Sequence, residues 1–398
     1  MVETIEGGLG ATEAKTIRIF LIAGEPSGDL LGGRLMGALK RHSGGDVVFA
    51  GVGGERMNDE GLISPFPMTE LSVMGLAEIL PRIFNLRRRV RETAKAIEQY
   101  APDILVTIDS PGFCFAVLKR LKRVPETRRI HYVAPSVWAW RPGRVHKFAR
   151  EFDHILTLLP FEPAYFEPVG LKSTFVGHAV IESKLADANG VGFRKQHRIG
   201  EEVPLLCVLP GSRQGEVKRH MAPFRLAVQL LQKRFPLVRV VIPTIPGLKD
   251  EVTSTIQNWG SPVLVVEGEK DKFDAMAASN VALAASGTVT LELALARVPS
   301  VVAYRMNLIT GWIIKALVKI PYANLVNILL DREGVPEFIQ GKCTGDRLAD
   351  ALENLLRDKL VYEAQQTAAD EAIKLLKTGD GLPSDIAANT ILSLVRQG

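Results

Sequence analysis

The chain has 398 residues, more than one hydrophobic core usually supports, so we expect two domains. Its 46% hydrophobic and 23% charged residues are ordinary for a globular protein, and the net charge of +5 is mild. The three cysteines are far apart and form no Cys-x-x-Cys or Cys/His cluster, which argues against a disulfide framework or a structural zinc site and indicates a reducing, cytoplasmic compartment.

Residues 1–15 carry three glutamates and no apolar core, so we expect a flexible leader and not a secretory signal. No run of eighteen apolar residues occurs, so we expect no segment that spans a bilayer.

Strand-like and helical patterns alternate through most of the chain. In the first half the expected helices include residues 75–100, interrupted near Pro81, and 115–122. The expected strands there are TIRIFLIAG, DVVFAGVG, DILVTID, RRIHYVAP and DHILTLLP. Residues 171–203 are polar and lack a sustained period, so we place the domain boundary in that stretch.

The alternation then resumes, with helices near residues 215–234 and 288–297. The expected strands are PLLCVLP, LVRVVIP, SPVLVVEG, NVALAAS and PSVVAYR. This pattern predicts an α/β protein with two Rossmann-like, doubly wound parallel-sheet domains facing a cleft. We expect these domains to be residues 16–190 and 191–345, followed by a helical tail, 346–398, that packs back on the first domain or exchanges with a partner.

Several common motifs are absent. The chain has no G-x-x-x-x-G-K-[ST], no G-x-G-x-x-G after its first strand and no G-x-S-x-G. These absences argue against a P-loop nucleotidase, a dinucleotide dehydrogenase and an α/β-hydrolase. No Asp-x-Asp pair suggests a metal–diphosphate clamp, so we expect no metal site.

The run ILVTID, residues 104–109, reads as a buried strand that ends on a carboxylate and is followed at once by Ser-Pro-Gly. Ligands of open α/β sheets gather at the carboxyl ends of parallel strands. Asp109 is therefore a candidate catalytic group.

The segment AGEPSGD, residues 23–29, follows the first expected strand and opens the first helix. Free N–H groups at a helix start can bind an anion or a sugar hydroxyl. Ser27 and Asp29 are equally well explained as helix N-caps, whereas Glu25 lies in the turn and is harder to explain in that way.

The segment LPGSRQGE, residues 209–216, leaves the first strand of the second half. Arg213 suits a phosphate because its guanidinium is a planar fork of donors. A surface ion pair with Glu216 is the competing explanation.

The segment ASGTVTLE, residues 285–292, places the small-residue turn Ser286, Gly287 and Thr288 between a strand and a helix. Amides at that helix start could bind a diphosphate, and the two oxygens of Glu292 could accept both hydroxyls of a ribose. The alternative for Glu292 is a first-turn carboxylate that stabilises the helix dipole.

Two stretches combine apolar and basic side chains. Residues 82–91 hold five arginines after the apolar run that begins near Met74, and Trp312 lies close to Lys315 and Lys319. Core packing with a solvated basic face explains both stretches. The alternative is a surface that binds acyl chains or an anionic leaflet.

Eight segments together resemble, in their order, the motifs of the lipid A disaccharide synthases over roughly residues 17–330. They are AGEPSGD, LSVMGLAEIL, IDSPGF, HYVAPSVWAWR, LPFE, FVGH, LPGSR and ASGTVTLE. The resemblance implies an inverting glycosyltransferase of GT-B fold that acts in the lipopolysaccharide biosynthesis of a Gram-negative bacterium. It would join UDP-2,3-diacylglucosamine to 2,3-diacylglucosamine 1-phosphate and release UDP and the β-1,6-linked disaccharide 1-phosphate.

The resemblance also implies cofactors, partners and location. No cofactor and no metal are expected. The partners are the two acylated sugars and the inner-leaflet membrane surface, with no nucleic acid, and a homodimer is left open. The protein would be cytoplasmic and peripherally associated with the inner membrane.

By the same resemblance, Asp109 is the base that accepts a proton from the acceptor 6-hydroxyl as that oxygen attacks the donor sugar. The other matching positions are Arg213, Ser286, Gly287, Thr288, Glu292 and Asn327 as contacts of the UDP donor, with Glu25 and Ser27 in the acceptor-side loop.

The chain departs from the family pattern at two places. The family commonly reads Asp-Ala-Pro-Asp-Phe where this chain has Asp109-Ser-Pro-Gly112-Phe113, so Asp109 is the only carboxylate of this motif. The segment NLVNIL also lacks the proline that the family usually has before the asparagine.

Two other functions compete with this one. A related UDP-sugar enzyme, such as a UDP-N-acetylglucosamine epimerase, would share the fold and act on a sugar nucleotide without acyl chains. A membrane-associated nucleotide-binding protein would bind UDP and liposomes without turnover. The combination of an acceptor-side Asp with a donor-side Arg/Glu site argues against the latter.

Overall fold

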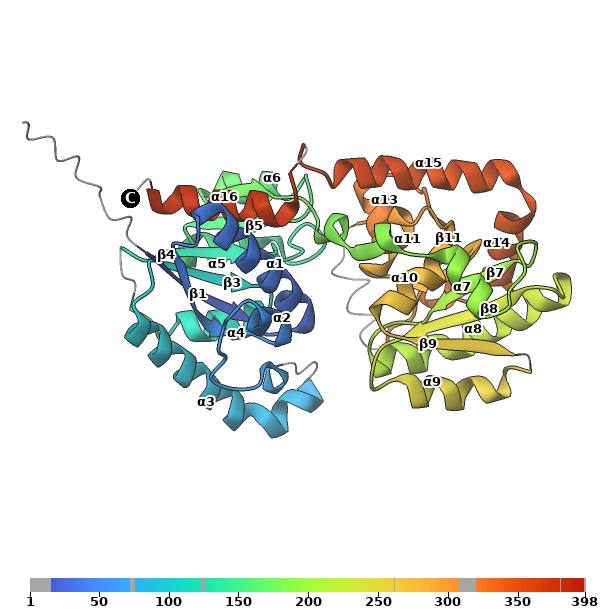
Figure 1. The fold of residues 1–398 in the computed structure, drawn as a ribbon, viewed down its shortest axis with the longest axis horizontal. Helices are drawn as coiled ribbons and strands as arrows, with labels where there is room; N and C mark the ends of the chain where they lie inside the picture. The colour runs from blue at the N-terminus through green and yellow to red at the C-terminus, as the bar shows by residue number, and fades with distance from the viewer. Residues whose placement is uncertain are drawn as a thin grey trace, which may run out of the picture. The chain divides into compact units, whose positions relative to one another are not determined.

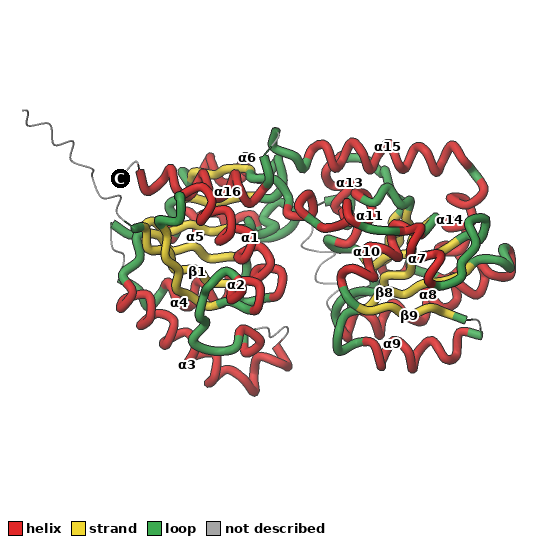
Figure 2. The backbone as a smooth tube through the Cα atoms, in the orientation of Figure 1, coloured by secondary structure: helices red, strands yellow, loops and turns green. Residues whose placement is uncertain are grey.

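The computed structural model describes residues 16–71, 76–122, 126–260, 262–307, 320–379 and 381–396. Its contacts divide the chain into two units. Unit 1 comprises residues 1–137, 143–176 and 381–398, and unit 2 comprises residues 138–142 and 177–380. Each unit contains a six-stranded parallel sheet with helices packed around it (Figures 1 and 2), which confirms the expected pair of doubly wound α/β sheets.

Unit 1 has the strand order β2-β1-β3-β4-β5-β6. Its central strands are buried on both faces, which is why they read as continuous apolar runs in the sequence. The strands are β1 (Ile17–Ala23), β2 (Val47–Val52), β3 (Ile104–Ile108), β4 (Arg128–Tyr132), β5 (His154–Thr157) and β6 (Lys172–Phe175). The helices are α1 (Pro26–Ser43), α2 (Glu55–Asp59), α3 (Leu76–Tyr100), α4 (Pro111–Leu118), α5 (Val145–Glu151), α6 (Pro163–Phe166) and α16 (Pro383–Arg396).

Helix α16 completes unit 1 although it lies far along the chain from the rest of that unit. It packs along α1, as the neighbouring red and blue helices of Figure 1 show. Ala387 and Ala388 are fully buried, and their small side chains allow close approach. Asp385 accepts hydrogen bonds from Arg41 and His42 at the end of α1, at 2.8 and 2.9 Å.

Unit 2 has the strand order β12-β11-β10-β7-β8-β9. The strands are β7 (Leu205–Leu209), β8 (Arg239–Thr244), β9 (Val263–Glu267), β10 (Val281–Ala285), β11 (Ser300–Tyr304) and β12 (Glu337–Ile339). The helices are α7 (Gly190–Gln196), α8 (Gln214–Arg234), α9 (Lys249–Ile256), α10 (Glu269–Ala278), α11 (Val289–Leu295), α13 (Leu325–Leu330), α14 (Gly345–Arg357) and α15 (Lys359–Leu375).

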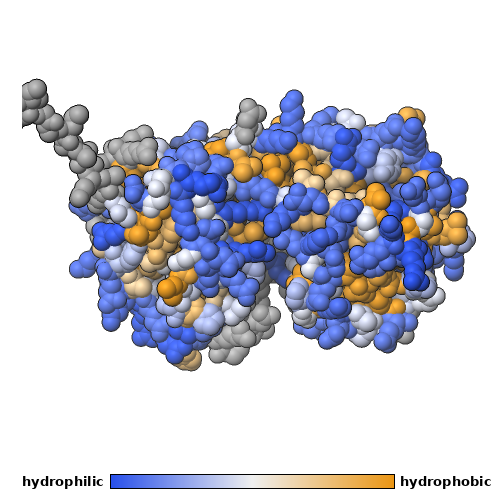
Figure 3. Space-filling model, in the orientation of Figure 1, coloured by the Kyte–Doolittle hydropathy of each residue, from blue (hydrophilic) through white to orange (hydrophobic). Residues whose placement is uncertain are grey.

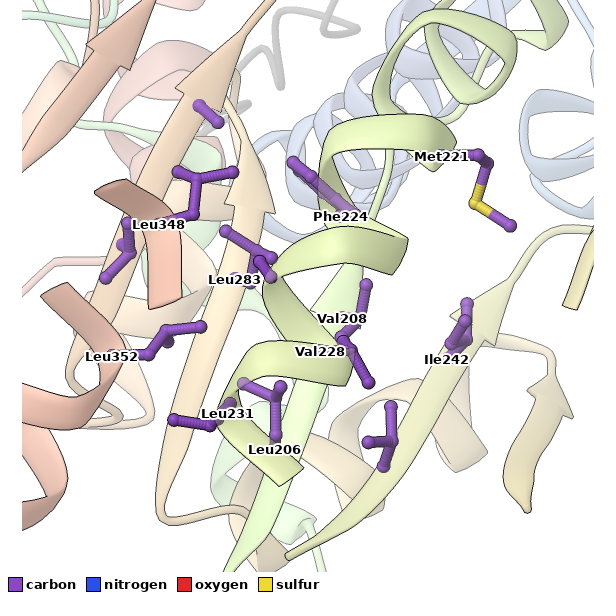
Figure 4. Close-up of a cluster of buried hydrophobic side chains, with 14 of the residues drawn as sticks. Leu206, Val208, Met221, Phe224, Val228, Leu231, Ile242, Leu283, Leu348 and Leu352 are labelled. Atoms are coloured by element: carbon purple, nitrogen blue, oxygen red, sulfur yellow. The ribbon is translucent and has the colours of Figure 1, made fainter. Parts of the chain in front are cut away.

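The core on one face of the second sheet forms where α8 and α14 cover β7, β8 and β10 (Figure 4). Each side chain of this type contributes about 1.5–3 kcal/mol by leaving water. The labelled members are Leu206, Val208, Met221, Phe224, Val228, Leu231, Ile242, Leu283, Leu348 and Leu352. This packing fixes α8 against β7, β8 and β10.

Three local expectations are wrong. Helix α3 runs without interruption from Leu76 to Tyr100, so Pro81 lies within its second turn, where it removes one backbone donor and does not end the helix. Helix α4 begins at Pro111, four residues before the expected start, because proline is well suited to the first helical position. The stretch 171–203, expected to be irregular, contains β6 and α7.

Some expectations fall on residues outside the described ranges. These are the leader 1–15, the segment 72–75 with Met74, and the segment 308–319 with Trp312 and both lysines. Among the helices that the structure describes, none is long and apolar enough to cross a membrane.

Asp29 joins α1 to the start of α2. It is 5% exposed, and its carboxylate accepts hydrogen bonds from the backbone N–H groups of Gly54, Arg56 and Met57, at 2.7, 3.0 and 3.1 Å. It therefore satisfies the free donors at the start of α2, and the alternative that it caps its own helix is wrong.

The substitution Asp29→Asn should lower the free energy of unfolding by roughly 2 kcal/mol, because the amide has one acceptor oxygen in place of two and turns an N–H toward a backbone donor. Urea denaturation measures the loss, and hydrogen exchange should become faster at the Gly54, Arg56 and Met57 amides. The control is Asp59→Asn at an exposed position of α2, with an expected change within about 0.5 kcal/mol. Equal effects of the two substitutions would contradict this role of Asp29.

Candidate functional site

In each sheet the chain reverses its direction of winding once. In unit 1 it goes from β1 to β2 on one side and then returns to β3 on the other, so the switch point lies between β1 and β3. In unit 2 the equivalent point lies between β7 and β10. Open α/β sheets bind ligands outside the carboxyl ends of the strands at such points, because the loops on either side diverge. The four segments selected from the sequence follow these four strands.

In unit 1 the loops after β1 and β3 are in direct contact. A Cβ atom added to Gly24 would lie 2.7 Å from Oγ of Ser110. One added to Gly28, in the first turn of α1, would lie 3.4 Å from the carbonyl oxygen of Ile108. The glycines of AGEPSGD therefore allow the start of α1 to pack against the turn that carries Asp109.

The turn after β3 has an unusual backbone. Asp109 and Ser110 have φ angles of +49° and +45°, in the left-handed region that residues with a Cβ atom rarely occupy. Val133, after the neighbouring strand β4, has φ +79° although it is β-branched. Such conformations destabilise the fold by about 1–3 kcal/mol each and cluster at functional sites.

Neighbouring groups hold this turn in place. The N–H of Asp109 donates to the carbonyl oxygen of Tyr132 at 2.9 Å. The thiol of Cys114 lies 3.4 Å from the carbonyl oxygen of Asp109 and donates to it. Burial raises the pKa of this thiol to about 12, so it keeps its proton. The half-buried side chain of Asp109 thus extends from a fixed backbone.

Gly112 occupies the place of the family's second acidic residue. It is exposed, and a Cβ atom added to it would meet nothing within 4 Å. The fold therefore has room for a side chain at this position.

Glu25 and Ser27 lie where the sequence suggests, at the start of α1. Glu25 is the N-cap residue, and its side chain makes no capping hydrogen bond. It is half-buried, whereas Ser27 is exposed. Glu25 directly follows Gly24, the residue that contacts the Ser110 turn, and Ser27 lies in the first turn of α1.

In unit 2, Arg213 is the N-cap residue of α8 and directly follows the β7 loop. Its guanidinium lies 3.3 Å from the carboxylate of Glu216, so the ion pair considered as the alternative is present. The side chain remains 55% exposed, which leaves most of its donors facing solvent. Glu216 also accepts a hydrogen bond from the N–H of Ser212 at 3.3 Å, which folds it back over the loop.

The turn after β10 is open toward solvent. The N–H of Ser286 donates to Ala303 of β11, and its hydroxyl donates to the carbonyl oxygen of Ala323 at 2.7 Å. Gly287 and Thr288 are exposed. Their N–H groups donate to no acceptor within the described part of the chain, so they are available to an anionic ligand.

Glu292 is held by a lysine from a neighbouring helix. The ammonium group of Lys272, in α10, donates to both carboxylate oxygens, at 2.8 and 2.9 Å. This pair fixes the orientation of Glu292, and each oxygen keeps a lone pair that can accept a further hydroxyl.

Asn327 is fully buried in α13. Its amide oxygen accepts hydrogen bonds from the N–H groups of Gly334 and Val335, at 2.8 and 2.9 Å, and its nitrogen donates to the carbonyl oxygen of Val335. It thus fixes the loop before β12.

Sequence reasoning missed His220. This residue is fully buried in α8, and its ring nitrogens lie 2.7 Å from the carbonyl oxygen of Pro210 and 2.9 Å from the N–H of Arg305. Burial is the main cause that lowers its pKa, so the ring is neutral. A signal existed: positions 217, 220, 221 and 224 form one helical face that is otherwise apolar.

A metal centre does not mark these loops within the part of the chain that the structure describes. No cluster of three or more His, Cys, Asp or Glu side chains that could hold a metal occurs among the described residues. An open groove of about 1090 Å³ is lined by residues of β12 and α14, including Phe338 and Arg357, and contains none of the predicted site residues.

Comparisons with solved structures agree with this fold. The Staphylococcus aureus "MnaA-UDP co-structure" has a TM-score of 0.64 at 14% identity, covering 96% of this chain and 97% of that one. The UDP-GlcNAc 2-epimerase of Neisseria meningitidis, bound to UDP-GlcNAc, has a TM-score of 0.62 at 11% identity, covering 96% and 100%. A glycosyltransferase of Rickettsia africae has a TM-score of 0.57 at 11% identity, covering 96% of this chain and 99% of that one. At such low identity these similarities establish the GT-B fold and not the reaction.

Sequence comparisons are more specific. The model of the lipid-A-disaccharide synthetase family matches residues 19–389. The lipid-A-disaccharide synthase of Rhodospirillum centenum is 50% identical, covering 96% of this chain and 95% of the relative. The synthase of Paramagnetospirillum magneticum is 49% identical, covering 96% and 98%. The chain therefore belongs to the lipid-A-disaccharide synthetase family, the hexosyltransferases that form the disaccharide of lipid A.

Proposed function

We propose that this chain transfers diacylglucosamine from UDP-2,3-diacylglucosamine to the 6-hydroxyl of 2,3-diacylglucosamine 1-phosphate, with Asp109 as the general base. The acceptor binds in unit 1, beside Glu25 and Ser27, and the UDP donor binds in unit 2. The observation that carries the proposal is the strained turn at the switch point of the first sheet, because it fixes a carboxylate where α/β sheets bind ligands.

The reaction is a single displacement. The acceptor oxygen forms a bond to C1 of the donor sugar while the bond between C1 and the UDP oxygen breaks, which inverts the configuration at C1. The acceptor proton passes to the carboxylate of Asp109, and UDP leaves with the bonding electrons. The leaving diphosphate gains negative charge as the bond breaks, so cationic and N–H donors that face it stabilise the transition state.

The turn and loop at the ends of β10 and β7 offer such donors. The exposed guanidinium of Arg213 and the N–H groups of Gly287 and Thr288 suit the diphosphate. Ser286 ties this turn to β11 and to Ala323. Glu292, oriented by Lys272, suits the ribose hydroxyls.

Asn327 has a supporting part in this proposal. Its amide is bonded to Gly334 and Val335, so it fixes the chain that leads into β12. Glu337 of β12 accepts the N–H of Ala323, and the carbonyl oxygen of Ala323 accepts the Ser286 hydroxyl.

The direct test is an incubation of the protein with radiolabelled 2,3-diacylglucosamine 1-phosphate and the acylated UDP donor, in buffer with EDTA. Thin-layer chromatography should show a labelled disaccharide, and UDP should be released only when both substrates are present. Turnover of UDP-N-acetylglucosamine without acyl chains, and none of the acylated pair, would instead identify an epimerase-type enzyme.

The substitution Asp109→Asn should lower kcat in this assay by roughly 10²- to 10⁴-fold, because the amide cannot accept the acceptor proton. The affinity for UDP, measured by calorimetry, should stay within about twofold, because the donor is held by unit 2. The matched control is Asp46→Asn, an exposed carboxylate that should leave kcat unchanged. Near-normal turnover of the Asp109 variant would show that another group is the base.

The substitution Gly24→Ala should lower kcat about tenfold, because the new methyl group collides with Oγ of Ser110 and displaces the turn that carries Asp109. The double variant Gly24→Ala/Ser110→Gly removes the colliding atoms and should recover most of the activity, since glycine also fits the left-handed backbone at position 110. A double variant as impaired as Gly24→Ala alone would contradict this explanation.

We also propose that α3 contacts the anionic inner leaflet. Four exposed residues, Phe84, Arg87, Arg88 and Arg91, follow the spacing i, i+3, i+4 and i+7 and therefore share one face of this helix. Phe84 is 78% exposed. In the view of Figure 3 the coloured part of the surface over α3 is mainly hydrophilic, which suits lipid headgroups.

A second apolar residue lies on a loop that α3 holds in place. Ile63 is 88% exposed in the loop that leads to Phe66 and Glu70. The guanidinium of Arg89 lies 4.6 Å from the ring centre of Phe66 and binds the carboxylate of Glu70. The hydrogen bonds from Arg89 are the main cause that lowers the pKa of Glu70 to about 2, so this pair stays charged. The basic and apolar groups suit a surface that is both anionic and apolar.

The double substitution Phe84→Ser/Arg87→Ser should lower binding to vesicles with anionic lipid about tenfold, because it removes one apolar and one cationic contact. Cosedimentation at low salt measures the change, and added salt should weaken binding of the unchanged protein. Leu237→Ser, which replaces an apolar residue that is also exposed but lies in unit 2, is the control and should have no effect. Equal binding of all three proteins would exclude this face of α3.

A further inference from the structure

We propose that His220 is a positioning residue that holds the loop carrying Arg213 at a fixed distance from the ends of β11 and β10. The inference rests on the proposed function, since it assumes that these segments bind the donor diphosphate. His220 itself is fully buried and touches no substrate.

Both ring nitrogens of His220 are bonded to backbone groups of different segments. Nδ1 lies 2.7 Å from the carbonyl oxygen of Pro210, in the β7 loop, and Nε2 lies 2.9 Å from the N–H of Arg305, which follows β11. A carbonyl can only accept and an N–H can only donate, so Nδ1 carries the proton and Nε2 accepts. The neutral ring thus bridges the two segments with one bond to each.

The preceding residue on α8 holds the other backbone group of Arg305. Nε of Arg219 donates to the carbonyl oxygen of Arg305 at 3.0 Å. Arg305 is therefore held through both its N–H and its carbonyl group by two consecutive residues of one helix. Because the core packs α8 against β7, β8 and β10, these bonds fix the end of β11 to the rest of the sheet.

The end of β11 is in turn bonded to the turn after β10. Ala303, two residues before Arg305, accepts the N–H of Ser286 at 3.1 Å. The hydrogen bonds thus link Pro210 to His220 and Arg305, and the β11 chain links Arg305 to Ala303 and Ser286. This chain of contacts joins the Arg213 loop to the Ser286 turn.

The surroundings of His220 favour the neutral bridging form. Its ring packs against those of Phe224 and Tyr304, with ring centres 5.5 Å away in both cases. The charged groups that act on it are Glu216, Arg219 and Arg305, and burial is the main cause that lowers its pKa. A protonated ring would place a donor at Nε2 opposite the N–H of Arg305 and would break the bridge.

Two substitutions separate the two halves of the bridge. In His220→Asn the amide nitrogen can replace Nδ1 and donate to Pro210, but nothing reaches Arg305. In His220→Gln the amide oxygen can replace Nε2 and accept from Arg305, but the bond to Pro210 is lost. If the distance between the two segments matters, each variant should bind UDP about tenfold more weakly, because either half alone leaves the Arg213 loop misplaced.

The experiment measures the Kd of UDP by calorimetry, together with the KM values of donor and acceptor. A positioning role predicts a higher Kd and donor KM with an unchanged acceptor KM. The control is Gln229→Ala, farther along α8, which removes a hydrogen bond to the carbonyl oxygen of Trp259 at 3.0 Å. This control should lower the melting temperature about as much as the His220 variants do and should leave the Kd of UDP unchanged.

A double-mutant cycle with Arg213→Lys tests whether His220 acts through that loop. The Kd of the double variant should rise by less than the product of the rises in the two single variants. The reason is that loss of His220 acts by misplacing the guanidinium of Arg213, which the lysine variant lacks. Fully multiplicative effects, or a Kd within twofold of normal in both His220 variants, would overturn the proposal. If the unchanged protein does not bind UDP, the proposed donor site is wrong and the role of His220 falls with it. If the unchanged protein binds UDP and both His220 variants bind it with a normal Kd, only the role of His220 is wrong and the proposed function stands.

Discussion

Parallel strand order is the constraint on which the chemistry of this chain depends. Parallel strands bring all their carboxyl ends to one edge of the sheet, and a single reversal of winding makes two neighbouring loops diverge there. The β1 and β3 loops of unit 1 and the β7 and β10 loops of unit 2 occupy these positions. In unit 1 the loops come so close that a Cβ atom at position 24 would lie 2.7 Å from Oγ of Ser110.

Buried polar side chains hold these loops and their neighbouring segments in fixed positions. Asp29 holds the start of α2, and Asn327 holds the chain before β12. His220 joins the β7 loop to the chain after β11. Each is almost or wholly buried and bonded to backbone groups outside its own helix, where the low dielectric strengthens the hydrogen bonds and makes a lost partner costly. The exposed loops at the strand ends therefore depend on buried residues for their conformation.

Much of the fold could be predicted from the sequence, because strands buried on both faces must be apolar throughout. Runs such as ILVTI and LLCVL therefore stand out. Strands β6 and β12 cannot be recognised in this way, because KSTF and EFI are short, partly polar and lie at the edges of their sheets. The sequence predicts too late a start for α4 because Pro-Gly after Ser110 is typical of a turn, although proline also suits the first helical position.

The candidate site was less accessible to sequence reasoning. The segments that follow the strands could be selected because the position of a loop relative to a sheet follows from the alternation of elements. The partners of their side chains could not, since Lys272 is twenty residues from Glu292 and Arg305 is 85 residues from His220. The left-handed backbone of Asp109 and Ser110 also had no sequence signal, because neither residue is glycine. The roles of the site residues themselves stay predictions.

The placement of α16 affects how the protein can be made. Unit 1 is complete only when the segment from residue 381 onward covers α1, whereas all of unit 2 precedes that segment. Roughly 200 residues separate the two parts of unit 1, which corresponds to about 10–40 s of synthesis at ordinary ribosomal rates. During this interval the apolar face of α1 lacks its covering helix. The nascent chain therefore has to finish its second unit before its first, and in that time the uncovered face is open to chaperones or to wrong partners.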